Sequence, residues 1–503
     1  MSFGHEIAEL VAKNERGLLA RHPSWERAAL SDVAELLNGY PYDSGRFNVS
    51  VGMPLVRIRD ILPGRSETRY DGPIDDPRMF QVRDGDLVVG MDGDFNSRIW
   101  KGGSALLNQR TCVLRTREGL YSQQFLAYVL PGYLKFINEH TSSVTVKHLS
   151  SKTVQEIPLP LPPLAEQKRI VARIDALFAE IDEGEAALAS ARKGLETFRR
   201  ALLKSAVTGD LTKDWRAANP PTESGHDLLA RIAREKSSNG TSKARARRAT
   251  EAVKSDLANL PNLPDGWAWA TIREIATVLG GLTKNPARDK MPIQAPYLRV
   301  ANVQMGALDL DDMKQIGVTA VDLQRASLEA GDLLVVEGNG SIDQIGRCAI
   351  WNGEINGCVH QNHIIKVRFI DVRISNWCLT WLLSPHGRQE IEQVAASTSG
   401  LHTLSISKVE ALPIPIPPPA EAAEILRRVS DALSAMDDTR TLLDAEASDA
   451  ARLKQSILKS AFEGRLVPQD PNDEPATALL VRLADNPAAE RRPRGRRKAQ
   501  AAS

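Results

Sequence analysis

The chain has few cysteines, almost no net charge and no long apolar run. Its four cysteines form no Cys-x-x-Cys pair; Cys348 and Cys358 could form a disulfide, but a reduced chain is the favoured interpretation. The net charge of +1 gives no global field toward nucleic acid, so any such binding must come from local patches. With no membrane-length apolar run and no signal-peptide apolar region in residues 1–17, we expect a cytoplasmic protein.

Catalytic motifs are missing as well. An adenine methyltransferase would carry an Asn/Asp-Pro-Pro-Tyr/Phe segment, but 219–222 reads Asn-Pro-Pro-Thr and lacks the aromatic residue that stacks a flipped base. The turn at 338–340 lacks the dinucleotide fingerprint, and there is neither a P-loop nor His-Glu-x-x-His. His360 and His363 have no cysteine or acid at a spacing that completes a metal set. We therefore predict a protein that is not an enzyme and holds no metal.

A long internal repeat is present instead. The stretch from Pro158 to Leu211 recurs without a gap from Pro413 to Leu466, and both copies end in Leu-Lys-Ser-Ala followed by a glycine and a leucine. A repeat of this length indicates two copies of one structural unit.

Each copy predicts a long helix. Pro162 and Pro163 have a fixed φ and no N–H, so the chain there is extended and a helix can begin only after them. Glu166 then lies in the first turn, where a carboxylate suits the helix dipole, and Gly209 is a stop signal. The apolar or small residues that follow alternate at four and three, which is a heptad seam. Its members are Ile170, Ile174, Leu177, Ile181, Gly184, Leu188, Ala191, Leu195, Phe198 and Leu202.

The second seam is weaker, because Thr439 and Glu446 interrupt it. Two such helices in one chain are most simply packed on each other, antiparallel. The alternative is that each packs on its own globular neighbour.

Ahead of each helix lies a mixed α/β segment. The chain starts with a predicted amphipathic helix, roughly Glu6 to Ala20, and Trp25 and Trp267 occupy equivalent places in the two copies. Asp86 and Asp332 are equivalent too, in Gly-Asp turns before short apolar strands, and we interpret them as turn residues.

These patterns predict an α+β fold with an internal pseudo-twofold repeat, in which two mixed α/β domains alternate with two long helices that pair as an antiparallel coiled coil. A basic segment follows each helix, at 243–248 and 491–498; such a segment can contact phosphates or form a solvated tail. The predicted parts are 1–157, 158–211 (long helix), 212–262 (linker with a short helix and a basic segment), 263–412, 413–466 (long helix) and 467–503 (helix and basic tail).

The chain resembles the specificity subunit of type I restriction-modification systems. The resemblance is carried by Pro-Leu-Pro-Pro-Leu-Ala-Glu-Gln at 160–167, its weaker echo at 415–422, the Leu-Lys-Ser-Ala endings and the duplicated architecture, and it covers nearly the whole chain. The second copy has Ala422 where the first has Gln167. That family alternates two target recognition domains, here 1–157 and 263–412, with two helical conserved regions.

The resemblance implies a non-catalytic subunit. Each recognition domain would read one half of a bipartite DNA target, while the helices set the spacer and dock two methyltransferase subunits, which restriction and translocation subunits join. S-adenosylmethionine, ATP and magnesium would bind to those partners and not to this chain. The alternative from a different class is a protein-interaction scaffold that binds no DNA and holds other proteins apart with its two α/β modules.

Candidate DNA-binding residues are polar side chains in loops between strands. Arginine suits guanine, asparagine and glutamine suit adenine, and lysine mostly binds phosphate; each could equally be an ordinary loop or turn residue. In the first domain they are Arg57, Arg59, Asp92, Asn96, Ser97, Arg98, Asn108, Gln109, Arg110, Lys147 and His148. In the second they are Lys284, Arg299, Asn302, Asn339, Ser341, Gln344, Gln361, Asn362, His363 and His402.

Overall fold

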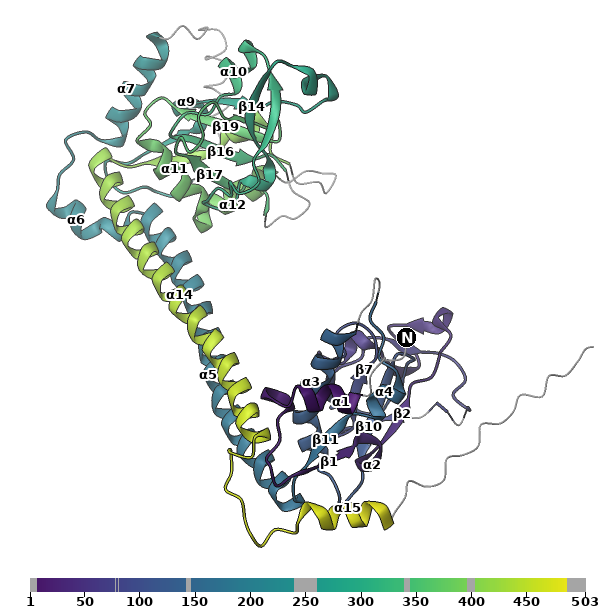
Figure 1. The fold of residues 1–503 in the computed structure, drawn as a ribbon. Helices are drawn as coiled ribbons and strands as arrows, with labels where there is room; N and C mark the ends of the chain where they lie inside the picture. The colour runs from purple at the N-terminus through teal and green to yellow at the C-terminus, as the bar shows by residue number, and fades with distance from the viewer. Residues whose placement is uncertain are drawn as a thin grey trace, which may run out of the picture. The chain divides into compact units, whose positions relative to one another are not determined.

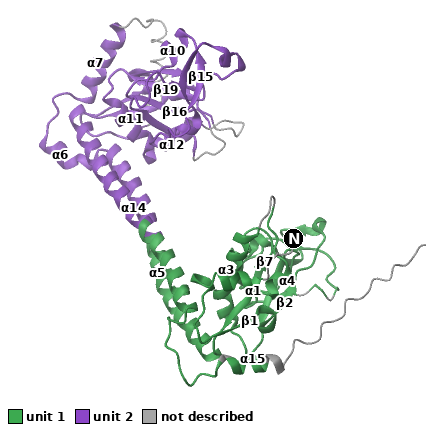
Figure 2. Ribbon diagram, viewed as in Figure 1, with its two compact units in different colours: residues 1–188, 445–503 green, residues 189–444 purple. Residues whose placement is uncertain are grey.

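A computed structural model describes residues 7–76, 78–79, 81–141, 146–238, 260–338, 344–395 and 403–485. The chain divides into two compact units, of which unit 1 is residues 1–188 with 445–503 and unit 2 is residues 189–444 (Figure 2). Among the described helices, none combines the length and the apolar character needed to cross a membrane. Both basic segments, 243–248 and 491–498, lie outside the described residues.

Unit 1 is built on short strands and several helices (Figure 1). Its strands are β1 (Glu26–Ala29), β2 (Ala34–Asn38), β3 (Phe47–Asn48), β4 (Met53–Val56), β5 (Arg69–Tyr70), β6 (Gln81–Val82), β7 (Leu87–Gly90), β8 (Ser97–Ile99), β9 (Ala105–Leu107), β10 (Thr111–Thr116) and β11 (Pro158–Leu161). Its helices before the long one are α1 (Ile7–Lys13), η1 (Gly17–Leu19), α2 (Leu30–Val33), η2 (Ser44–Arg46), η3 (Ile58–Asp60), α3 (Gln123–His140) and α4 (Ser151–Gln155).

The strands of unit 1 form three sheets. One has the order β2-β10-β7-β8, another β3-β5-β4-β9-β6, and β1 pairs with β11 alone. The largest core gathers Trp25, Phe125 and Tyr133 with Ile170 and Phe462, so both long helices contribute to it. The long helices are therefore part of the core of this unit.

The N-terminal helix is shorter than the sequence predicts. The expected helix from Glu6 to Ala20 ends at Lys13, and a separate 3₁₀ turn covers Gly17–Leu19. Asn14 donates its side-chain amide to the carbonyl of Leu10 at 2.9 Å, which satisfies a carbonyl at the end of the helix. Gly17 then takes a left-handed φ of 62°, a conformation that glycine adopts at little cost. The apolar pattern in this stretch therefore did not reveal the break.

Unit 2 is also built from short strands and helices around the long helices. Its strands are β12 (Ala268–Thr271), β13 (Ala276–Gly280), β14 (Ile293–Leu298), β15 (Lys314–Val318), β16 (Asp332–Val336), β17 (Cys348–Trp351), β18 (Val359–His360), β19 (Ile364–Phe369) and β20 (Pro413–Ile416). Its shorter helices are η4 (Asp210–Thr212), α6 (Lys213–Ala218), α7 (Gly225–Ser238), α9 (Ile272–Ile275), η5 (Pro286–Lys290), η6 (Val300–Asn302), α10 (Ala320–Ala326), α11 (Ile374–Leu383), α12 (Pro385–Ala395) and α13 (Ile406–Ala411).

Two of the three sheets of unit 2 match those of unit 1 in strand number and order, and the remaining sheet has three strands where unit 1 has five. The strands run β13-β19-β16-β17 in one sheet and β15-β14-β18 in another, and β12 pairs with β20. Trp267 and Trp377 anchor the main core, to which Leu203, Ile425 and Val429 of the long helices contribute. The four cysteines of the chain are buried and free.

In both units the proline stretch before the long helix is a strand. In unit 1, β11 runs antiparallel to β1, with Pro158 opposite Ala29 and Pro160 opposite Arg27. Because proline has no N–H, its outer edge presents carbonyls only. The Tyr121 hydroxyl donates to the Pro160 carbonyl at 3.0 Å, and in unit 2 the Trp377 indole N–H donates to the Pro415 carbonyl.

The two long helices are α5 (Leu164–Val207) and α14 (Pro419–Phe462), each of 44 residues. As predicted, α5 begins directly after the prolines. Gly209, with φ 76°, follows its end, and Gly464, with φ 70°, follows α14. The predicted seam is buried where the helices enter the cores of the units, whereas Phe198 and Leu453 remain 52% and 51% exposed.

A short helix, α15 (Ala476–Asp485), follows α14. Its Leu479 is fully buried in the core of unit 1.

Candidate nucleic-acid interface

Three segments of unit 1 meet at one end of the β2-β10-β7-β8 sheet. The backbone N–H of Met91, just after β7, donates to the carbonyl of Arg110, just before β10, at 2.9 Å. Leu149 N–H donates to the Met91 carbonyl at 2.7 Å, and Gly93 N–H to the Lys147 carbonyl at 3.0 Å. Main-chain bonds therefore fix three polar loops that are far apart in the sequence.

Three predicted side chains converge on these loops. Asp92 approaches His148, with Oδ1 and Nδ1 2.6 Å apart, and lies 3.6 Å from Nε of Arg110. Nη1 of Arg110 is 3.2 Å from the same imidazole nitrogen. Arg110 has a left-handed φ of 71°, which is uncommon for a residue with a side chain. The carboxylate thus holds two side chains, of which Arg110 is 55% exposed.

Two neighbouring predicted residues follow the same turn. Gln109 is exposed, and its backbone N–H donates to the Tyr40 carbonyl at 2.8 Å. Asn108 is half-buried, and its Oδ1 is enclosed without a hydrogen-bond partner among the described residues.

The remaining predicted residues of unit 1 have other partners. The guanidinium of Arg57 lies over the ring of Phe47, 5.6 Å from its centroid, and Arg59 Nη2 donates to Thr68 Oγ1 at 3.0 Å. Arg98 is exposed on β8 and donates to the Leu62 carbonyl. These three arginines bond to none of the groups that hold Arg110.

Lys147 and Asn96 mainly serve the fold. The Lys147 ammonium donates to the backbone carbonyl of Asn138 at 2.6 Å and to its Oδ1 at 3.1 Å. Asn96 is half-buried, and its carbonyl accepts the Gly90 N–H at 2.8 Å. Ser97 Oγ is buried without a described partner.

Unit 2 has the same loop arrangement with different side chains. Glu337, just after β16, donates its N–H to the carbonyl of His363, just before β19, at 2.9 Å, and its own carbonyl accepts the Leu404 N–H at 2.6 Å. The Glu337 carboxylate Oε2 lies 2.9 Å from Nδ1 of His363, whose side chain is 58% exposed. Asn362 Nδ2 is 3.4 Å from Nε2 of the same ring. His363 therefore has the position in unit 2 that Arg110 has in unit 1.

Three predicted residues of unit 2 are tied into its framework. Asn302 is 3% exposed; its Oδ1 accepts the Arg299 N–H at 2.9 Å, and its Nδ2 donates to the Asp309 carbonyl at 2.8 Å. Arg299 donates to Asp312 Oδ2 at 2.9 Å, and Gln361 Oε1 accepts the backbone N–H of Val300 at 3.2 Å. Their side chains stabilise the turn around η6.

Two others point to solvent. Lys284 and Gln344 are exposed and form no hydrogen bond or ion pair within the described part of the chain. Asn339, Ser341 and His402 lie outside the described residues.

The equivalent aspartates are turn residues, as predicted. Asp86 Oδ2 accepts the Arg83 N–H at 2.8 Å, and Asp332 Oδ2 accepts the Glu329 N–H at 2.8 Å. Each also pairs with an arginine of the adjacent strand, Asp86 with Arg115 at 2.7 Å and Asp332 with Arg368 at 2.6 Å.

His360 is a core histidine. It is fully buried, Nδ1 lies 3.0 Å from the Ile364 carbonyl, and burial, followed by the charge of Lys366, lowers its pKa to about 4. Among the described residues no group of three His, Cys, Asp or Glu side chains could hold a metal ion.

The sequence reasoning missed Glu337. The available signal was its position, because it is the first polar residue after the buried strand β16 and faces the turn before the neighbouring strand. Asp92 and His148 were among the sequence candidates, but their contact joins segments 56 residues apart and no spacing rule predicts it.

Comparison with known proteins gives a consistent result. Residues 23–188 match the family model described as "Type I restriction modification DNA specificity domain". The chain is 34% identical over 522 residues to the type I restriction enzyme EcoBI specificity subunit of Escherichia coli, covering 99% of each chain. It is 25% identical over 503 residues to the EcoKI specificity subunit of Escherichia coli strain K12, covering 94% of this chain and 97% of the relative.

A solved structure has a similar fold. One chain from a study of complex assembly and conformational transition in the type I R-M system superposes with a TM-score of 0.60 at 16% identity, covering 88% of this chain and 99% of that one. The full-length similarity to the EcoBI subunit carries the assignment. The chain belongs to the family of type I restriction enzyme specificity subunits.

Proposed function

We propose that this chain selects the DNA target of a type I restriction-modification complex and that each unit reads one half of a bipartite sequence. The observation that carries this is the matching pair of loop clusters, in which Arg110 and His363 stand at equivalent turns of sheets with the same strand order. Exposed side chains on loops fixed by a rigid sheet are suited to base-edge contacts in the major groove.

We further propose that α5 and α14 pair as an antiparallel coiled coil and give the molecule a pseudo-twofold repeat. In unit 1, Nζ of Lys454 on α14 lies 2.6 Å from Oδ1 of Asp182 and 2.9 Å from Oε2 of Glu185, both on α5. In unit 2, Arg192 of α5 lies 2.6 Å from Asp444 of α14. A helix of this length is about 66 Å long, and DNA repeats about every 34 Å, so the pair is long enough to fix the spacer between two half-sites.

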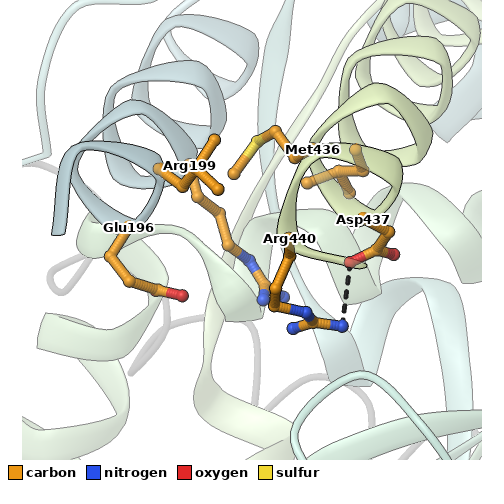
Figure 3. A pocket seen from close by; sticks show the side chains of 7 residues that line it. Glu196, Arg199, Met436, Asp437 and Arg440 are labelled. Atoms are coloured by element: carbon orange, nitrogen blue, oxygen red, sulfur yellow. Dashed lines mark ion pairs between the residues drawn. The ribbon is translucent and has the colours of Figure 1, made fainter. Parts of the chain in front are cut away.

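The same helices are the proposed docking sites for two methyltransferase subunits. In unit 1 a groove of about 640 Å³ runs between Ile181, Leu188 and the half-exposed Leu453. In unit 2 a smaller hollow of about 80 Å³ is lined by Glu196 and Arg199 of α5 and by Met436, Asp437 and Arg440 of α14 (Figure 3). Apolar side chains exposed along a helix pair are typical of surfaces that bind another protein.

Catalysis then belongs to the partners. We propose that the methyltransferase and the restriction subunits supply the chemistry and bind S-adenosylmethionine, ATP and magnesium, and that this chain supplies recognition. The competing function is a scaffold of two α/β modules that binds no DNA.

Methylation mapping in cells that carry this chain with its methyltransferase partner tests the proposal. We expect one bipartite motif with a fixed undefined spacer. Exchange of residues 1–157 for those of another system should change one half and leave the other intact. If no methylated motif depends on this chain, the scaffold function replaces the DNA-reading one.

A further inference from the structure

The two loop clusters have equivalent main-chain hydrogen bonds and carry different side chains. In each cluster, the residue just beyond β7 or β16 donates its backbone N–H to the carbonyl of the residue just before the neighbouring strand, β10 or β19. The side chain at that turn is Arg110 in unit 1 and His363 in unit 2, and both are more than half exposed. A carboxylate touches each of them, Asp92 at 3.6 Å and Glu337 at 2.9 Å.

Carboxylates are unexpected on a face that binds DNA, because they repel phosphates. Asp92 and Glu337 lie beside the reading candidates instead of in the turns where Asp86 and Asp332 cap the backbone. Both carboxylates therefore act on the neighbouring side chain, Asp92 on Arg110 and Glu337 on His363.

Glu337 determines which ring nitrogen of His363 carries the proton. A carboxylate only accepts, so Nδ1 at 2.9 Å is the protonated nitrogen. In the neutral ring Nε2 is then an acceptor, which agrees with the Asn362 amide nitrogen 3.4 Å away. The contact with Asn362 is long, so a base amino group can replace it, and the histidine then offers its Nε2 lone pair to that base.

Asp92 acts on Arg110 differently. It faces the Nε side of the guanidinium, and a guanidinium offers only donors whatever holds it. His148, 2.6 Å from the same carboxylate, limits the positions that Asp92 can take. The Arg110 guanidinium is therefore held in one orientation, and it still offers only hydrogen-bond donors.

We propose that Arg110 and His363 are the base-reading side chains of the two units, and that Asp92 and Glu337 are positioning residues that decide what each presents to a base. Arg110 fits the paired acceptors of guanine, and His363 accepts from the exocyclic amino group of adenine or cytosine. The inference rests on the proposed function and names the chemistry of the same site.

The two carboxylate-to-amide variants have different expected outcomes. Asp92→Asn keeps the guanine preference at its position but weakens discrimination about tenfold, because the fork loses its anchor. With Glu337→Gln the amide can either accept from or donate to Nδ1, so the tautomer of His363 is no longer fixed. Its position in the motif should then relax from an amino-bearing base to any base. The other half-site should be unaffected in each case.

Methylation mapping of the complete complex measures both effects. Binding assays then compare DNA duplexes in which the base at the affected position of the target is replaced by each of the other three. Asp94→Asn and Glu392→Gln are matched controls, since both are exposed carboxylates without a hydrogen bond or ion pair among the described residues. They measure the general gain in affinity from removing one negative charge, which should leave the motif unchanged.

Arg110→Lys and His363→Gln, at exposed positions, give a second readout should the carboxylate variants fail to fold. Each should alter one base position, in the half read by its own unit. The inference is overturned if all these variants retain the wild-type motif, or if both halves weaken equally, as for a structural defect. A wild-type complex with no bipartite motif would instead reject the proposed function.

Discussion

The starts of the two long helices differ in how a buried glutamate is satisfied. Glu166, in the first turn of α5, accepts the Trp25 indole N–H at 3.0 Å and the Gln469 amide N–H. Glu421, in the first turn of α14, accepts the indole N–H of Trp267 at 2.9 Å. Both carboxylates are buried, and the indole contact is the same in the two units.

Glu166 and Glu421 differ in whether a cation pairs with the carboxylate. Glu421 also accepts the Thr212 hydroxyl and Nε of Arg216, each at 2.8 Å. Near Glu166 the cation Arg169 is paired with Asp473, with Nη2 and Oδ2 2.6 Å apart. Burial raises the pKa of Glu166, although its hydrogen bonds from Gln469 and Trp25 act in the opposite direction. The repeat therefore preserves the acid and the indole but not the cation.

The largest effect is expected from Arg216→Leu. It leaves the Glu421 carboxylate buried without its cation, and losing one partner of such a pair costs about 3 kcal/mol. Hydrogen exchange should show lost protection in unit 2 and unchanged protection in unit 1. Gln469→Leu is the matched variant in unit 1 and should cost about 1 kcal/mol, because it removes a neutral donor. Equal costs would show that the two glutamates are satisfied in the same way.

Replacing each glutamate by glutamine should have a smaller effect on stability, and the effect should differ between the two units. Glu421→Gln should cost about 2 kcal/mol at neutral pH, because a charge-assisted bond is lost. Glu166→Gln should leave unit 1 as stable or more stable at that pH.

The pH dependence has a definite sign. Because the pKa of Glu166 is raised in the folded state, its contribution to stability is complete below the ordinary value of 4.5 and is lost as the pH rises through the raised pKa. Denaturant unfolding of Glu166→Gln followed by probes in unit 1 should lack this decline. A decline that persists in the variant would assign it to another group.

The smallest effect concerns the helix pair itself. Lys454→Ala removes the ion pairs with Asp182 and Glu185 and should lower the stability of unit 1 by about 0.5 kcal/mol, less at high salt. Arg199 in unit 2 is equivalent to Lys454 in the sequence repeat, and it forms no ion pair among the described residues. Arg199→Ala is therefore expected to leave the stability of unit 2 unchanged. Thermal unfolding at two salt concentrations compares them.

Much of the fold could be predicted because its signals are local. The prolines before Leu164 set the start of α5, and the repeat carried that prediction to the second copy. The burial of Glu166 could not be predicted, since its indole partner lies 141 residues away. The early end of the first helix depends on a side-chain cap at Asn14.

The candidate site was predicted at the level of loops. Residue type selected Arg110 and His363, whose side chains are more than half exposed, but it also selected Lys147, whose ammonium donates to Asn138, and Asn302, which caps a turn. Amides and ammonium groups serve backbone carbonyls as readily as bases. Only the three-dimensional partners distinguish these uses.

The proline strands have a consequence for how the chain behaves before it meets other subunits. A strand at the edge of a sheet normally invites a strand from another molecule, which is a route to aggregation. Along β11 the outward positions are Pro158 and Pro160, which have no N–H to donate. Their carbonyls already accept from Arg27 and Tyr121. Pro158 and Pro160 therefore give a newly made chain no N–H donor, and their carbonyls no vacant acceptor position, with which to add a strand of another chain along this edge.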